Sequence, residues 1–162
     1  MKISVKKAAP DVYALGFDDT ELALDGEANF LAIRVSTTAN LGAYVSNLGP
    51  VSPSLLYTRM LANAYRTPAI YAEVRGVLTN TVFTDAYRGA GRPEAIYVLE
   101  RVMDRAARDL GVDPMELRRR NFIAPQKFPY KTVTDETYDV GDFNLVLDRL
   151  VQEADLAGFE TR

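Results

Sequence analysis

The sequence predicts an α+β fold in which an antiparallel or mixed sheet packs against several helices. Most strand patterns lie before residue 79, and the longest helical patterns follow residue 92. Strands followed by helices are typical of α+β layouts. A length of 162 residues and a hydrophobic content of 48% allow one domain with a sizeable core.

The earliest clear strands form a predicted hairpin. Residues 21–25 and 30–35 have strand patterns on either side of an Asp-Gly pair, which favours a tight turn. Leu31, Ile33 and Val35 should share one face of the second strand, because side chains alternate along a strand.

A short helix and a further strand are expected next. Ser52-Pro53 has the pattern of a cap followed by a first-turn proline, which predicts a helix through residue 61. After Pro68, aliphatic side chains alternate with aromatic or charged ones from residue 70 onward, which predicts a strand over residues 70–78. Its two faces carry Ile70, Ala72 and Val74 on one side, and Tyr71, Glu73 and Arg75 on the other.

The clearest helical pattern lies between Pro93 and Gly111. Apolar residues there repeat along one helical face, which should point to the core. They are Ile96, Leu99, Met103, Ala106 and Leu110. The solvated side should carry ion pairs four residues apart, Asp104–Arg108 and Arg105–Asp109.

Two more helices are expected in the last third of the chain. The first is capped by Asp113 and ends in arginines 118–120, which should be solvated or salt-bridged. Residues 122–137 have no clear period and predict an irregular segment. The last helix begins near Asp142 and stops by Gly158.

The composition narrows the chemistry that these residues can perform. The chain has no cysteine and no histidine, which excludes thiolate nucleophiles, iron–sulfur ligation and imidazole bases within it. A net charge of −3 argues against a nucleic-acid surface. No apolar run approaches the ~20 residues of a membrane span, and the first residues lack a secretion signal. A cytoplasmic protein is therefore expected.

The loop before the long helix, residues 84–94, is the strongest candidate site. Its glycines let the backbone approach a ligand, and the following helix start favours an anion. Arg88 adds a five-donor cation. An ordinary glycine turn before a helix is the alternative. Asp85 and Arg92 either flank the site or form a structural salt bridge with one another, and the salt bridge is favoured.

Four motifs give the chain a specific resemblance. They are Ala39-Asn40-Leu41-Gly42-Ala43-Tyr44, Val77-Leu78-Thr79-Asn80-Thr81, Ala86-Tyr87-Arg88-Gly89-Ala90-Gly91-Arg92-Pro93-Glu94-Ala95 and Asp113-Pro114-Met115-Glu116-Leu117-Arg118-Arg119-Arg120-Asn121-Phe122. Residues 19–162 resemble a middle segment of the molybdenum-cofactor-binding large subunit of the xanthine dehydrogenase, aldehyde oxidase and aerobic carbon monoxide dehydrogenase family. Residues 1–18, where only a short strand at 12–15 is indicated, do not match it.

The resemblance implies roles for the candidate loop. In the family this loop lies beside the molybdenum centre and its pyranopterin. Arg88, Gly89, Ala90 and Gly91 are therefore expected to bind the molybdopterin cofactor, and Ala90 is expected to contact the substrate as well. No catalytic residue and no metal ligand is expected within the chain.

Two departures from the family pattern narrow the implied reaction. Gly89 stands where authentic carbon monoxide dehydrogenases carry a cysteine that bridges copper to molybdenum, so this bridge cannot form. Ala90 stands where purine hydroxylases carry a phenylalanine that packs on the substrate. Hydroxylation of an aldehyde or an N-heteroaromatic compound is implied, rather than oxidation of carbon monoxide or xanthine.

The resemblance also implies an incomplete enzyme. An upstream glycine-rich cofactor loop and a C-terminal glutamate base are expected in the family and are not found in these 162 residues. We expect a fragment or split piece that is inactive and binds no cofactor alone. Its partners would be the rest of the large subunit with iron–sulfur and flavin subunits, and a homo-oligomer is a further expectation. The alternative is a non-catalytic, stand-alone α+β domain for interaction or anion binding.

Overall fold

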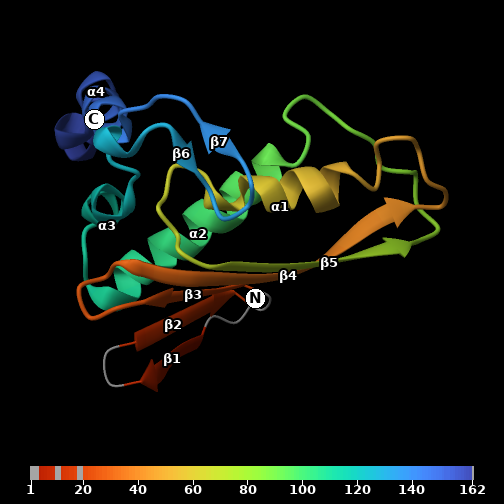
Figure 1. The fold of residues 1–162 in the computed structure, drawn as a ribbon, viewed down its shortest axis with the longest axis horizontal. Coiled ribbons are helices and arrows are strands. Elements are labelled where there is room, and N and C mark those ends of the chain that lie inside the picture. The colour runs from red at the N-terminus through yellow and green to blue at the C-terminus, as the bar shows by residue number, and fades with distance from the viewer. Residues whose placement is uncertain (1–3, 10–11, 18–19, 162) are drawn as a thin grey trace.

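A five-stranded mixed sheet forms one layer of the protein. The computed structural model describes residues 4–9, 12–17 and 20–161 (Figure 1). The strands follow the order β1-β2-β3-β4-β5, with β1 at Ser4–Ala9, β2 at Val12–Phe17, β3 at Thr20–Leu24, β4 at Phe30–Gly42 and β5 at Ile70–Leu78. Neighbours up to β4 pair antiparallel, whereas β4 and β5 are parallel. The predicted α+β class with a mixed sheet is confirmed.

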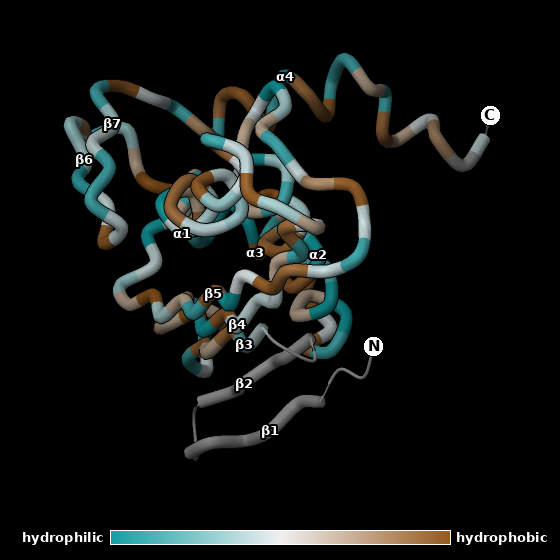
Figure 2. Tube along the Cα trace, turned by 90° about the vertical axis from the view of Figure 1, so that its right-hand side faces the viewer, coloured by the Kyte–Doolittle hydropathy of each residue, from teal (hydrophilic) through white to brown (hydrophobic). Residues whose placement is uncertain are grey.

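The helices form a second layer on one face of this sheet (Figures 1 and 2). The connection from β4 to β5 coils through η1 (Ser52–Leu56), α1 (Tyr57–Arg59) and η2 (Met60–Ala62). Beyond β5 follow α2 (Arg92–Leu110), α3 (Pro114–Asn121), η3 (Pro125–Lys127), β6 (Tyr130–Lys131), β7 (Thr137–Tyr138), α4 (Phe143–Glu153) and η4 (Leu156–Thr161). The long coiled connection is what a parallel pair such as β4 and β5 requires. The segment predicted to be irregular contains η3 and the short β6–β7 hairpin.

The predicted hairpin is confirmed, but Leu31 does not share the buried face of Ile33 and Val35 as predicted. Ile33 and Val35 are buried, whereas Leu31 is 37% exposed. The register of β3 and β4 shifts at this point, because Ala23 pairs with Ala32 while Leu24 pairs with Phe30. Leu31 is the unpaired residue of this irregularity, and Phe30 takes the buried place instead.

The long helix α2 supplies most of the helical side of the core. Its buried residues are Ala95, Leu99, Val102, Met103, Ala106 and Ala107, which join the cluster formed by the sheet. Leu99, Met103 and Ala106 confirm the predicted apolar face. Ile96 does not, because it is 46% exposed and lines a surface cavity beside Phe143.

An ion-pair network joins α2 to α3. Arg118 lies 2.7 Å from Glu100 and 2.8 Å from Asp104. Burial alone would lower the pKa of Arg118, but its hydrogen bonds to Asp104 and Glu100 outweigh burial and raise it. Asp104 therefore pairs with α3 and not with Arg108 as predicted. The predicted pair Arg105–Asp109 is present at 2.8 Å, and all three arginines 118–120 are salt-bridged as expected.

The helix ends follow local signals in two cases and depart from them in one. Asp113 accepts hydrogen bonds from the amides of Met115 and Glu116, and Asp142 accepts one from Leu145. Ser52 is not a cap, because the residue in that position is Val51 and its side chain makes no capping bond. A helix was nevertheless predicted correctly in this segment.

Candidate functional site

Residues 79–84, which lead from β5 into the candidate loop, are fixed to the end of β4. The amide of Thr79 donates to Gly42 O at 2.9 Å, and that of Ala43 donates to Thr81 O at 3.0 Å. Thr84 N donates to Leu41 O at 3.3 Å. A Cβ on Gly42 would lie 2.3 Å from Cα of Phe83, so only glycine allows the two segments to run this close.

A polar cluster adds to this attachment. Asn40 Oδ1 accepts hydrogen bonds from Thr79 Oγ1 at 2.6 Å and from Gly42 N at 2.9 Å. Its amide nitrogen donates to Thr81 Oγ1 at 3.2 Å. Hydrogen bonds therefore join two of the four motifs quoted above, residues 39–44 and 77–81. Asn40 was not among the predicted site residues, although its place in a motif signalled it.

The second half of the loop is a tight turn into α2. The amide of Ala90 donates to Tyr87 O at 2.9 Å. Arg92 binds Gly89 O twice, through its backbone amide at 3.1 Å and through Nη1 at 3.2 Å. Gly89, Ala90 and Gly91 all have positive φ, at 106°, 34° and 86°. The structure thus brings the four predicted residues together in one turn.

Several donors of this turn are free to bind a ligand. In the described part of the chain, no acceptor binds the amides of Arg88 or Gly89. The Arg88 side chain is exposed and has no hydrogen bond or ion pair with any described residue. A Cβ on Gly89 would contact only the ring of Pro93, at 3.1 Å, so its outer side is open. Amide donors and one arginine suit a ligand rich in acceptor atoms.

The favoured salt bridge between Asp85 and Arg92 is not formed. Asp85 Oδ1 accepts a hydrogen bond from the amide of Ala86 at 2.7 Å. The guanidinium of Arg92 is directed instead to Gly89 O. The signal that sequence reasoning missed is the three-residue spacing, which lets an arginine at the helix start reach the carbonyl of the preceding turn.

The floor of the turn is the backbone of η1 and α1. A Cβ on Gly91 would lie 2.5 Å from Tyr57 N and 2.6 Å from Ser52 O. Ser52 Oγ is buried and has no hydrogen-bond partner among the described residues. Gly91 is itself buried, so its place in the turn is governed by this packing.

These features define the class of protein: an α+β domain whose glycine turn, at a helix start, carries open backbone amides and an arginine without a partner among the described residues. Residues 17–122, more than half of the chain, match the family model described as the molybdopterin cofactor-binding domain. The chain belongs to this family, as the resemblance predicted.

Two curated relatives of the chain are subunits of dehydrogenases. The chain is 34% identical over 140 residues to the carbon monoxide dehydrogenase large chain of Hydrogenophaga pseudoflava, covering 85% of this chain and 17% of that one. It is 32% identical over 124 residues to the 6-hydroxypseudooxynicotine dehydrogenase complex subunit gamma of Paenarthrobacter nicotinovorans, covering 76% and 16%. The chain thus spans about one sixth of these relatives.

Solved structures confirm the fold. Quinoline 2-oxidoreductase from Pseudomonas putida 86 superposes with a TM-score of 0.79 at 29% identity, over 95% of this chain and 19% of that one. Reconstituted CO dehydrogenase from Oligotropha carboxidovorans gives 0.77 at 28% identity, over 94% and 19%. The predicted fold and family are confirmed, and the roles of Arg88, Gly89, Ala90 and Gly91 remain predictions.

Within residues 4–9, 12–17 and 20–161, no three or more acidic side chains gather as they would around a metal ion. None of the helices in the same ranges combines the length and the apolar character that crossing a bilayer demands.

Proposed function

We propose that these 162 residues form one wall of the molybdenum site in a molybdenum hydroxylase large subunit. Arg88, Gly89, Ala90 and Gly91 would border the cofactor, with Ala90 on the substrate side. The observation that carries the proposal is the turn itself. Its open Gly89, and its Arg88 that has no partner among the described residues, lie within the stretch that matches the family model. The cofactor would supply the redox chemistry, and this chain would supply donors and shape.

The donors of the turn fit the group that the family implies. A pterin cofactor presents oxygen and nitrogen acceptors, and the free amides of Arg88 and Gly89 are complementary to them. The Arg88 guanidinium is exposed and makes no ion pair with a carboxylate of the described residues, so its positive charge is available to a ligand. The two hydrogen bonds from Arg92 hold the Gly89 carbonyl in place. The other contacts to the cofactor would come from the remaining parts of a large subunit.

The substrate class follows from two small residues. Gly89 has no thiol, and the chain has no cysteine at any other position, so it cannot bind copper through a thiolate. Ala90 is half-buried and leaves more room than an aromatic side chain would. Both features favour hydroxylation of an aldehyde or an N-heteroaromatic compound. Relatives named nicotinate hydroxylase and nicotine 6-hydroxylase, at 30% and 28% identity, support the second of these classes.

The chain spans only about one sixth of these relatives, and this small share indicates which partners it would need. Curated relatives bear names such as large chain and complex subunit gamma, which describe parts of multi-subunit enzymes. We therefore expect the remainder of a large subunit, with iron–sulfur and flavin subunits, to be needed for turnover. A stand-alone anion-binding domain is the second candidate, and the free Arg88 is the observation that favours it.

Replacing Arg88 with methionine tests the role of the turn. In an assembly with the remaining parts of a large subunit, Arg88→Met should weaken cofactor retention by about tenfold, the size of one charge-assisted hydrogen bond. Molybdenum per protein, measured after dialysis, gives the readout. Arg101→Met is the matched control, because Arg101 is an exposed cation of α2 outside the turn. Equal molybdenum content in both variants would show that Arg88 does not help to hold the cofactor.

A further inference from the structure

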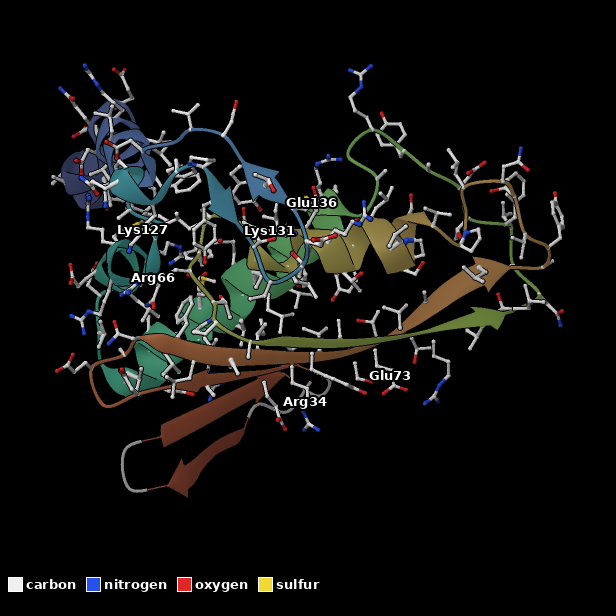
Figure 3. The ribbon with its side chains drawn as sticks, in the orientation of Figure 1. Arg34, Arg66, Glu73, Lys127, Lys131 and Glu136 are labelled. Carbon is white, nitrogen blue, oxygen red and sulfur yellow. The ribbon has the colours of Figure 1, made fainter. Side chains whose placement is uncertain are left out.

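A concave site lies away from the turn. A cavity of about 420 Å³ opens where the ends of α3, η3, β6 and α4 meet the segment before β5. Its polar lining consists of Arg66, Arg119, Arg120, Lys127, Tyr130 and Asn144. None of residues 84–94 takes part. Figure 3 labels Arg66 and Lys127 on this side of the molecule.

The lining carries four cations and no carboxylate. Two of these cations are compensated from outside the cavity, because Arg119 pairs with Asp148, and Arg120 pairs with Glu116 at 3.2 Å. The other two, Arg66 and Lys127, have no ion pair with any residue that the structure describes. The cavity therefore keeps an excess of two positive charges.

Two neutral acceptors hold the Arg66 guanidinium in place and leave some of its N–H donors without a partner among the described residues. Its Nη2 donates to Asn29 Oδ1 at 3.1 Å and to Arg120 O at 2.9 Å. Neither Nε nor Nη1 of Arg66 makes a hydrogen bond with the described residues. An arginine oriented in this way presents donors in the geometry that phosphate or carboxylate oxygens accept.

The rest of the lining is apolar and rigid. The Phe122 ring stacks on Tyr65 at 5.4 Å and contacts Phe143 at 5.8 Å between centroids. Ile123 is buried and donates its amide to Ala64 O at 3.0 Å. A cavity of this volume is much larger than a lone phosphate, so it has room for an organic body against this wall.

We infer that the cavity binds a small organic phosphate monoester. Two uncompensated cations match the charge of one phosphate, which is close to −2 near neutral pH. A monocarboxylate would neutralise only one of them. The concave shape favours a small molecule over a flat protein surface. This site is independent of the molybdenum site proposed above.

Titration of the purified chain with phenyl phosphate tests this inference. The chain should bind phenyl phosphate more tightly than inorganic phosphate, and it should not bind phenol, by calorimetry at constant ionic strength. Lys127→Gln should weaken phenyl phosphate binding by about tenfold, because one charge-assisted contact is lost. Lys131→Gln is the matched control, since Lys131 is an exposed lysine outside the cavity that pairs with Asp135. It should bind as the unaltered chain does.

Three results would overturn the inference. They are no binding of phenyl phosphate by the unaltered chain, equal weakening in the two lysine variants, or saturation only by an acidic peptide. The last would indicate a protein segment as the occupant. Lys127 is exposed and has no side-chain partner among the described residues, so its replacement should leave the fold intact. Circular dichroism of each variant checks this.

Discussion

Replacing Gly91 with alanine should lower the free energy of unfolding by about 3–5 kcal/mol, combining left-handed strain with overpacking. Gly91 has φ of 86°, and a Cβ there would lie 2.5 Å from Tyr57 N, 2.6 Å from Ser52 O and 2.8 Å from Leu56 C. All three atoms are backbone atoms, which cannot rotate away as a side chain would. The turn and η1 would have to separate.

Gly111 offers a control for this substitution. It also has positive φ, at 67°, but a Cβ there would meet nothing within 4 Å. Gly111→Ala should therefore cost only the strain of the left-handed backbone, about 1–2 kcal/mol. Urea unfolding of both variants measures the difference. Equal losses would show that the close packing beneath the turn is not a constraint.

Replacing Asn121 with alanine should cost about 2–4 kcal/mol, because buried groups would lose their partners. Asn121 is 1% exposed at the end of α3. Its Oδ1 accepts from Phe30 N at 2.8 Å, and its Nδ2 donates to Ala28 O at 3.0 Å and Leu117 O at 2.9 Å. The side chain thus connects α3 to the turn that begins β4.

Two further variants test whether the lost hydrogen bonds of Asn121 cause this loss of stability. Asn121→Asp keeps an acceptor for Phe30 N but sets a carboxylate against two carbonyl oxygens, so it should also be destabilising. Asn47→Ala removes an exposed asparagine that has no side-chain hydrogen bond in the described structure, and should change stability by less than about 0.5 kcal/mol. Urea midpoints give the comparison. An Asn121→Ala protein as stable as the parent would contradict the assigned role.

Local signals in the sequence predicted much of the fold. The alternation of β5 and the periodic face of α2 are properties of single elements, and both are confirmed except at Ile96. Asp113 and Asp142 cap their helices for the same reason, because a cap needs only residues two or three positions away.

Three predictions failed at contacts between separate elements. The register shift beside Leu31 depends on how β3 meets β4. Asp104 pairs with Arg118 because α3 packs against α2, whereas the i,i+4 rule covers only contacts within one helix. Ile96 is left at a surface cavity because the segment before α4 covers it only in part. None of these pairings has a signal in the local pattern.

The candidate site shows the same division. Glycines, a first-turn proline and one arginine predicted an anion-binding turn. The amides of Arg88 and Gly89 have no acceptor among the described residues, and anion binding itself stays a prediction. The attachment through Asn40 and the clamp from Arg92 depend on the folded arrangement of β4, the loop and α2. The identity of the ligand came from the family resemblance and from no property of the turn alone.

The molybdenum content of this chain tests the central claim most directly. The protein is purified alone and again after co-expression with the remaining parts of a large subunit, and metal per chain is measured by mass spectrometry. We predict no stoichiometric molybdenum in the chain alone and close to one atom per chain in the assembly. Stoichiometric molybdenum in the chain alone, or none in a stable assembly, would contradict the account.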